Sequence, residues 1–107
     1  MSGKISSSTP LSVITTDKGI DLKGSLVYST ISSVLSEGCK LLEKHQTDSV
    51  SINLDDVKRI DSAGITLLLE WKRLCDKNNK SFHVVGANEQ AISLITTNKM
   101  QDILSLK

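Results

Sequence analysis

The chain has 107 residues, with 13 Lys and Arg against 12 Asp and Glu, which gives a formal net charge of +1 at pH 7. This length fits one domain with one hydrophobic core. The near-neutral charge and an aromatic content of only 3% disfavour nucleic acid as a partner, because its binders use clustered cations and aromatic platforms. No apolar run approaches the ~20 residues of a membrane span, and no signal peptide opens the chain. We therefore expect a soluble, cytoplasmic protein.

The first ten residues are rich in Ser and Thr and show no periodicity. We expect a flexible lead-in over 1–10 and one domain over 11–107. The two cysteines, Cys39 and Cys75, are far apart in the sequence and are expected to be free thiols in a reducing compartment.

The first half of the domain is predicted to start with a β-hairpin. The hairpin consists of a strand over 11–16, a turn at 17–19 and a second strand ending at Gly24. Apolar residues then recur at helical spacing, which predicts one amphipathic helix capped by Ser29 or Thr30.

The second half alternates strands and helices. The expected elements are a strand over 49–53, a polar loop over 55–61, a helix over 62–78, a strand over 81–85, a helix capped by Asn88 and a short helix over 101–106. The predicted fold class is therefore α/β, as a single domain. Its mixed four-stranded sheet begins with the N-terminal hairpin, continues as βαβαβα and is covered by helices.

The helix over 62–78 carries two adjacent apolar strips. On a helical wheel, the strip that faces the core contains Leu67, Leu68, Trp71, Leu74 and Cys75, with Gly64 in the same arc. Beside it, Ile65 and Leu69 line up with Ser62, and Thr66 and Arg73 flank that line. Spacing alone favours packing of Ile65 and Leu69 against a neighbouring helix. The alternative is a docking strip for another protein.

Asp61 and Ser62 stand at the predicted start of this helix. Either residue is typical of an N-cap, which accepts hydrogen bonds from free backbone N–H groups. The alternative for Ser62 is contact with a partner or phosphorylation, since a phosphate there would meet the free amides and the positive end of the helix dipole.

Two segments resemble a known family. The stretch INLDDVKRIDSAGITLLL from Ile52 to Leu69 is similar to the signature of STAS domains, and LKGSL from Leu22 to Leu26 is similar to that family's L-x-G-x-L segment. The resemblance extends over about 11–106. It implies a STAS-like domain, with a mixed sheet and helices packed against it, that acts by binding other proteins.

One branch of this family contains bacterial anti-sigma-factor antagonists. Resemblance to it implies that Ser62 is phosphorylated by a partner serine kinase, which is itself an anti-sigma factor. The usual motif of this branch is Asp-Ser-Ser-Gly-Leu-Gly, from which the chain departs at Ala63, Ile65 and Thr66. Val27 also replaces a common acidic residue.

The MlaB-like branch is the more similar one, through DSAGITLLL from Asp61 to Leu69 and VGAN from Val85 to Asn88. It implies a subunit of a phospholipid-transport ABC complex that supports the ATPase subunit, which is its partner. The protein would then be cytoplasmic and reach the inner membrane only through the complex. By this resemblance the partner-binding residues are Asp61, Ser62, Ile65, Thr66, Leu69 and Arg73.

Catalysis is not expected. The chain lacks the Walker, G-x-G-x-x-G and G-x-S-x-G motifs, and His45, His83 and the two cysteines lack the paired spacing of zinc sites. We expect no cofactor and no metal. The remaining alternative is a small hydrolase or ligand-binding domain that uses Ser62, Asp61 and a histidine, and it needs that histidine close to the Ser62 hydroxyl.

Overall fold

The fold was obtained as a computed structural model that describes residues 11–32, 34–44 and 47–107. The predicted lead-in over 1–10 and His45 lie outside these ranges. The elements in chain order are β1 (Ser12–Thr16), β2 (Gly19–Leu26), α1 (Tyr28–Ile31), α2 (Leu35–Lys44), β3 (Ser49–Ile60), α3 (Ser62–Lys77), β4 (Ser81–Val85) and α4 (Glu89–Thr97).

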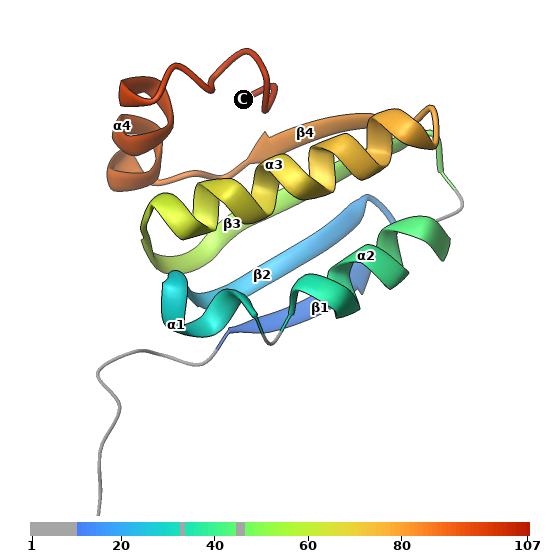
Figure 1. Ribbon diagram of the computed structural model, residues 1–107, viewed down its shortest axis with the longest axis horizontal. Coiled ribbons are helices and arrows are strands. Elements are labelled where there is room, and N and C mark those ends of the chain that lie inside the picture. The colour runs from blue at the N-terminus through green and yellow to red at the C-terminus, as the bar shows by residue number, and fades with distance from the viewer. Residues whose placement is uncertain (1–10, 33, 45–46) are drawn as a thin grey trace, which may run out of the picture.

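The four strands form one mixed sheet in the order β1-β2-β3-β4. β1 pairs antiparallel with β2, and β2, β3 and β4 are parallel. Helices α1, α2 and α3 lie on one face of the sheet, and α4 lies beyond it at the end where β3 meets α3 (Figure 1). The predicted α/β domain with its mixed four-stranded sheet is therefore confirmed.

The hydrophobic core lies between the sheet and these helices. Because crossovers between parallel strands are right-handed, the helices that join them collect on one face. Among the largest fully buried side chains are Trp71 and Leu68 from α3, Ile52 and Leu54 from β3, and Leu22 from β2. No helix in the described ranges is long and apolar enough to cross a membrane.

Strand β3 is much longer than predicted. It runs through Asp55–Ile60, which was expected to be a polar loop, and the prediction of a strand ending near Asn53 is wrong. Strand β3 has one extra residue relative to β2 at two places. They lie opposite the steps from Asp21 to Lys23 and from Gly24 to Ser25 of β2. Each extra residue resets the alternation of buried and exposed side chains, so a continuous strand no longer has a period of two.

The first predicted helix is divided into α1 and α2, which corrects the expectation of a single helix. Strand β2 also continues beyond Gly24 to Leu26, so α1 starts earlier than predicted. Thr30 is not the cap but the third residue of α1. Its hydroxyl donates to the carbonyl oxygen of Ser25 at 2.6 Å and accepts from the N–H of Val27 at 3.1 Å. These bonds fix α1 to the end of β2.

The predicted last helix over 101–106 is also wrong, because these residues form turns that end in a single β-bridge. Leu106 pairs in parallel with Val84 on the outer edge of β4. The N–H of Lys107 donates to the Val84 carbonyl oxygen at 2.9 Å. Leu104 is fully buried, so its apolar side chain is used in the core although no helix forms.

Helices α2 and α3 are in close contact at Gly38. A Cβ atom at this position would overlap the ring of Trp71, which is itself fully buried. Glycine therefore sets the distance between the two helices.

We predict that Gly38→Val lowers the free energy of unfolding by about 2 kcal/mol or more, because the added atoms displace Trp71 from a packed core. Urea unfolding followed by the fluorescence of this one tryptophan measures the effect. Ser36→Val is the matched control on the exposed side of α2 and should change stability by less than about 0.5 kcal/mol. Equal stability of the two variants would contradict the packing described.

Candidate functional site

The first turn of α3 lies directly against the end of β2. Here the N–H of Asp61 donates to the Leu26 carbonyl oxygen at 3.2 Å. Gly64 allows this approach, because a Cβ atom at position 64 would overlap that same carbonyl oxygen and crowd the side chain of Ile60. The predicted placement of Gly64 in the arc that faces the core is confirmed, because Gly64 is buried.

The Asp61 carboxylate caps α3, as predicted, and also reaches a second element. One oxygen, Oδ1, accepts from the N–H groups of Ala63 at 2.9 Å and Gly64 at 3.2 Å. The other oxygen, Oδ2, accepts from the N–H of Tyr28 at 3.1 Å. Both oxygens are therefore engaged by backbone donors, which suits a structural clamp better than a catalytic base.

Ser62 is the first residue of α3 and is exposed. Its carbonyl oxygen accepts from the Thr66 hydroxyl at 3.1 Å. Within the described ranges its own hydroxyl makes no hydrogen bond to the protein. The capping role falls to Asp61, so the Ser62 hydroxyl is available to a partner or a modifying group.

A hollow of about 400 Å³ lies beside Ser62, between the start of α3 and helix α4. The Nε2 atom of Gln90 donates to the Ile60 carbonyl oxygen at 3.0 Å and so fixes α4 to the end of β3. The N-cap of α4 is Asn88, as predicted. The α4 side chains that line the hollow are those of Gln90, Ser93, Leu94 and Thr97. Sequence reasoning missed these residues, because no motif marks them.

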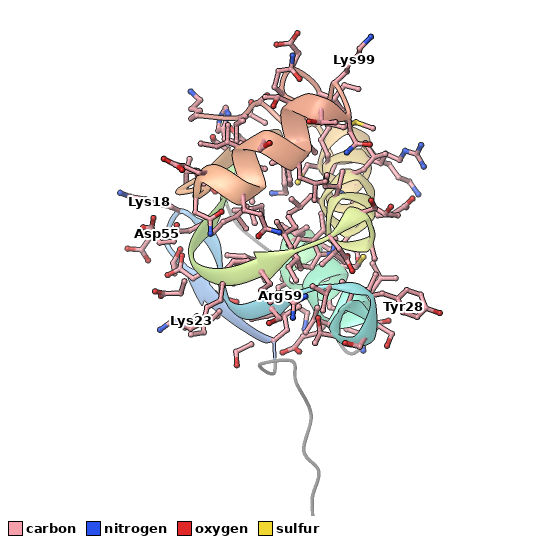
Figure 2. The ribbon with its side chains drawn as sticks, turned by 90° about the vertical axis from the view of Figure 1, so that its left-hand side faces the viewer. Lys18, Lys23, Tyr28, Asp55, Arg59 and Lys99 are labelled. Atoms are coloured by element: carbon pink, nitrogen blue, oxygen red, sulfur yellow. The ribbon has the colours of Figure 1, made fainter. Side chains whose placement is uncertain are left out.

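Tyr28 is a further member of this end of the molecule that the sequence interpretation missed. Its side chain is 80% exposed, although its N–H is held by Asp61. Figure 2 shows Tyr28 pointing away from the protein at the end of the domain where α1 lies, with Arg59 at the same end. The available signal was the rarity of aromatic residues, since the chain has one Tyr, one Trp and one Phe.

The structure divides the remaining predicted partner-binding residues. Ile65 is only 5% exposed and belongs to the core, which agrees with the interpretation that spacing favours, packing inside the protein, and not with an exposed docking strip at this residue. Helix α1 is among the elements in contact with α3. Leu69 is half-buried, and Thr66 is exposed beside Ser62.

Arg73 lies far from Ser62, about 16 Å along the helix at roughly 1.5 Å per residue. Its guanidinium group pairs with Glu70 at 3.1 Å. It lines a second hollow of about 380 Å³ between α2 and α3, together with Leu35, Cys39, Glu70, Leu74 and Lys77. The predicted strip from Ser62 to Arg73 is therefore not one continuous surface.

The structure does not bring His83 to Ser62. His83 pairs with Ser51 near the start of β3, whereas Ser62 follows the other end of that strand. From Ser51 to Ile60 the strand extends by about 30 Å at roughly 3.3 Å per residue. A Ser–His pair of the kind a hydrolase needs is absent from the described residues, and His45 lies outside them.

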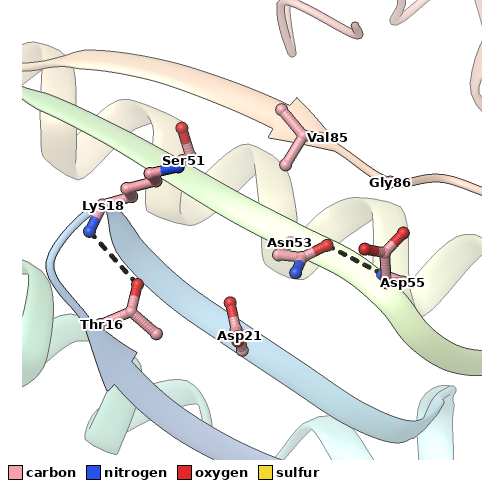
Figure 3. Close-up of a pocket in the computed structure, with 8 residues that line it drawn as sticks. All are labelled: Thr16, Lys18, Asp21, Ser51, Asn53, Asp55, Val85 and Gly86. Carbon is pink, nitrogen blue, oxygen red and sulfur yellow. Dashed lines mark hydrogen bonds between the residues drawn. The ribbon is translucent and has the colours of Figure 1, made fainter.

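A third hollow, of about 380 Å³, lies on the face of the sheet that α1–α3 leave open (Figure 3). Asp21, Asn53 and Asp55 place polar groups around it, and the Asn53 Oδ1 atom accepts from the N–H of Asp55 at 3.0 Å. Across the described ranges, no three His, Cys, Asp or Glu side chains gather in a way that would hold a metal ion.

Both cysteines are free thiols, and burial raises the pKa of each. The pKa of Cys75 in α3 rises to about 11. For Cys39 the nearby Glu43 and Glu70 carboxylates add to the effect of burial on the pKa. Neither thiol is therefore a reactive thiolate near neutral pH.

The raised pKa of Cys75 predicts a loss of stability at alkaline pH. The thiol ionises in the unfolded chain from its usual pKa of 9.0, but in the folded protein only at about 11, so the free energy of unfolding falls as pH rises through this window. Urea unfolding at pH 8 to pH 10.5 measures the slope. Cys75→Ala should flatten it and Cys39→Ala should flatten it less. Identical slopes for wild type and Cys75→Ala would contradict the burial of this thiol.

We predict that alanine lowers the stability of the fold at Asp61 but has little effect on it at Ser62. Asp61→Ala should cost about 1–2 kcal/mol of stability, because three backbone donors lose their acceptor. Ser62→Ala is the matched control and should change stability by less than about 0.5 kcal/mol. Thermal or urea unfolding measures the stability of both variants. A larger loss of stability for Ser62→Ala would show that the Ser62 hydroxyl has a structural role.

Three solved structures are similar to this fold. An anti-sigma-factor antagonist (STAS) domain protein from Planctomyces limnophilus has a TM-score of 0.74 at 12% identity, over 92% of this chain and 89% of that one. The anti-sigma factor antagonist SpoIIAA in its unphosphorylated form has a TM-score of 0.71 at 10% identity, over 91% and 87%. SpoIIAA of Bacillus in its phosphorylated form has a TM-score of 0.64 at 10% identity, over 91% and 90%. At these identities the likeness shows the fold.

Comparison with curated protein sequences gives no match. A family model described as "Mlab, STAS domain" matches residues 15–105, which is most of the chain. Together with the mixed sheet, the capped start of α3 and the similar solved structures, this match establishes the family. The chain belongs to the MlaB-like STAS domains.

Proposed function

We propose that this protein is a non-catalytic subunit that binds the ATPase of an Mla-type phospholipid-transport ABC complex and supports its activity. STAS domains act through protein–protein interaction in anti-sigma antagonists and MlaB-like proteins. The observation that carries the proposal is that Ser62 is exposed and its hydroxyl makes no hydrogen bond within the described ranges, while the Asp61 side chain caps the helix.

The docking end comprises Tyr28, Asp61, Ser62, Thr66 and the α4 residues that line the hollow. Its parts come from three helices that are held by hydrogen bonds between backbone and side-chain groups at Asp61 and Ile60. A surface fixed in this way loses little conformational entropy when a partner binds. An exposed tyrosine such as Tyr28 is also typical of protein interfaces, where aromatic side chains supply much of the contact.

The sequence motif supports the MlaB-like assignment over other STAS functions. Asp61-Ser62-Ala63-Gly64 followed by a leucine-rich helix is similar to the pattern of that branch, and the family description carries the same name. In this proposal the domain is cytoplasmic, takes no cofactor and meets the inner membrane only through its complex. Leu69 extends the contact along α3, and Arg73 contributes only if the partner reaches the second hollow.

A second candidate is an anti-sigma-factor antagonist switched by phosphorylation of Ser62. It is favoured by the exposed hydroxyl at a helix N-terminus, where a phosphate would meet backbone amides and the positive dipole end. The partner would then be a serine kinase that acts as an anti-sigma factor. The sequence departs from that branch at Ala63, Ile65 and Thr66.

We predict that Ser62→Trp weakens binding to the ATPase by roughly a hundredfold or more, because the indole occupies the space that the partner needs. The matched control is Ser81→Trp, also at an exposed serine, at the start of β4 and thus at the opposite end of the sheet. Far-UV circular dichroism and the melting temperature should stay near wild type for both. Equal loss of binding in the two variants, or none in either, would contradict docking at Ser62.

The identity of the partner separates the two candidates. Tagged protein purified from its own host should carry an ATPase with Walker motifs, and the intact mass should show no phosphate. A stoichiometric phosphate on Ser62, together with recovery of a serine kinase, would replace the ABC proposal by the anti-sigma one.

A further inference from the structure

The two edges of the sheet differ in how their backbone groups are satisfied. At the β4 edge, the N–H of Val84 donates to the Ser105 carbonyl oxygen at 3.3 Å and the N–H of Lys107 donates to the Val84 carbonyl oxygen at 2.9 Å. The C-terminal residues therefore cover this edge. Within residues 11–32, 34–44 and 47–107, β1 pairs only with β2, so no described strand covers the opposite edge of the sheet.

Strand β1 also lacks the features that usually protect an open edge. Its sequence is SVITT, which contains no charged residue and no proline, and four of its five residues are β-branched. Natural edge strands usually carry lysine, proline or a bulge that prevents pairing with another chain. The β1–β2 register is continuous over all five residues, so the edge is regular as well as open.

The side chains of Val13 and Ile14 in β1 lie on opposite faces of the sheet. Val13 lies opposite the buried Leu22 and packs against the core. Ile14 lies opposite Asp21 on the open face of the sheet and is 42% exposed. A second strand paired with this uncharged edge would cover the exposed isoleucine side chain.

We propose that β1 is a homodimerisation edge, at which a second copy of this chain adds its own β1 in antiparallel orientation. With a two-fold axis perpendicular to the sheet at Ile14, the β1 edges of the two copies pair with each other. No β1 edge then remains for a third copy, so the assembly closes as a dimer. The register places Ile14 opposite Ile14 of the second copy, and Ser12 opposite its Thr16. The result is a continuous eight-stranded sheet with α1, α2 and α3 of both copies on one face.

Two geometric consequences follow from this dimer. The two-fold axis reverses strand direction, so the docking ends at Ser62 of the two copies point in opposite directions and stay free for partners. The contact involves only five residues from each copy, so the interface is small and the dimer is expected to be weak. This inference does not depend on the identity of the partner at the docking end.

Sedimentation velocity of the full chain between about 10 μM and about 1 mM tests the proposal, because small interfaces associate in such ranges. Wild type should shift from monomer towards dimer across this range. Ile14→Lys should stay monomeric at every concentration, since the register puts the two lysines directly opposite each other. Ile92→Lys is the matched control, at an isoleucine of α4 that is 41% exposed, and should dimerise as wild type does.

Hydrogen exchange provides a second readout that does not depend on a variant. The backbone amides of Ser12–Thr16 should exchange more slowly as protein concentration rises, while those of Glu89–Thr97 should not change. A wild type that stays monomeric throughout would overturn the proposal. So would dimerisation of Ile14→Lys at wild-type strength, or concentration-dependent protection at α4 instead of β1.

Discussion

The site depends on the close seating of the first turn of α3 against the end of β2. Gly64 makes this possible by leaving room for the Leu26 carbonyl oxygen, which accepts the N–H of Asp61. The Asp61 carboxylate then joins the start of α3 to the N–H of Tyr28 at the start of α1. One short segment thereby fixes two helices. The hydroxyl of Ser62, the next residue, makes no hydrogen bond to the described residues.

In the proposed function, this arrangement separates stability, through Asp61, from recognition, through Ser62. Asp61 supplies the helix cap, so the exposed Ser62 is free to be covered or modified without loss of the fold. Helix α4 adds a second wall, fixed through the bond from Gln90 to the end of β3. The same end of the domain therefore suits both functions considered, which differ in whether a protein surface or a phosphate meets the hydroxyl.

The sequence predicted much of the fold because most elements obey simple periodicities. The hairpin, the parallel order, the helix starting at Ser62 and the caps at Asp61 and Asn88 all follow from local patterns. The extension of β3 was missed because bulges break its period of two among charged residues. Ile65 was placed beside the core strip because a helical wheel carries no information on the neighbouring helices, such as α1, that α3 contacts.

The candidate site was predicted only in part, for a physical reason. Asp61 and Ser62 belong to a local motif, whereas Tyr28 and the α4 residues reach the site through tertiary contacts that sequence spacing does not encode. Arg73 shares the helix of Ser62 but lines the separate hollow between α2 and α3.

Hydrogen exchange of the protein bound to its purified partner tests the central claim most directly. Binding at the start of α3 should slow exchange of amides in the first turns of α1 and α3 and along α4, with α2 and β1 unchanged. Protection confined to the α2–α3 hollow or to the open face of the sheet would contradict the account.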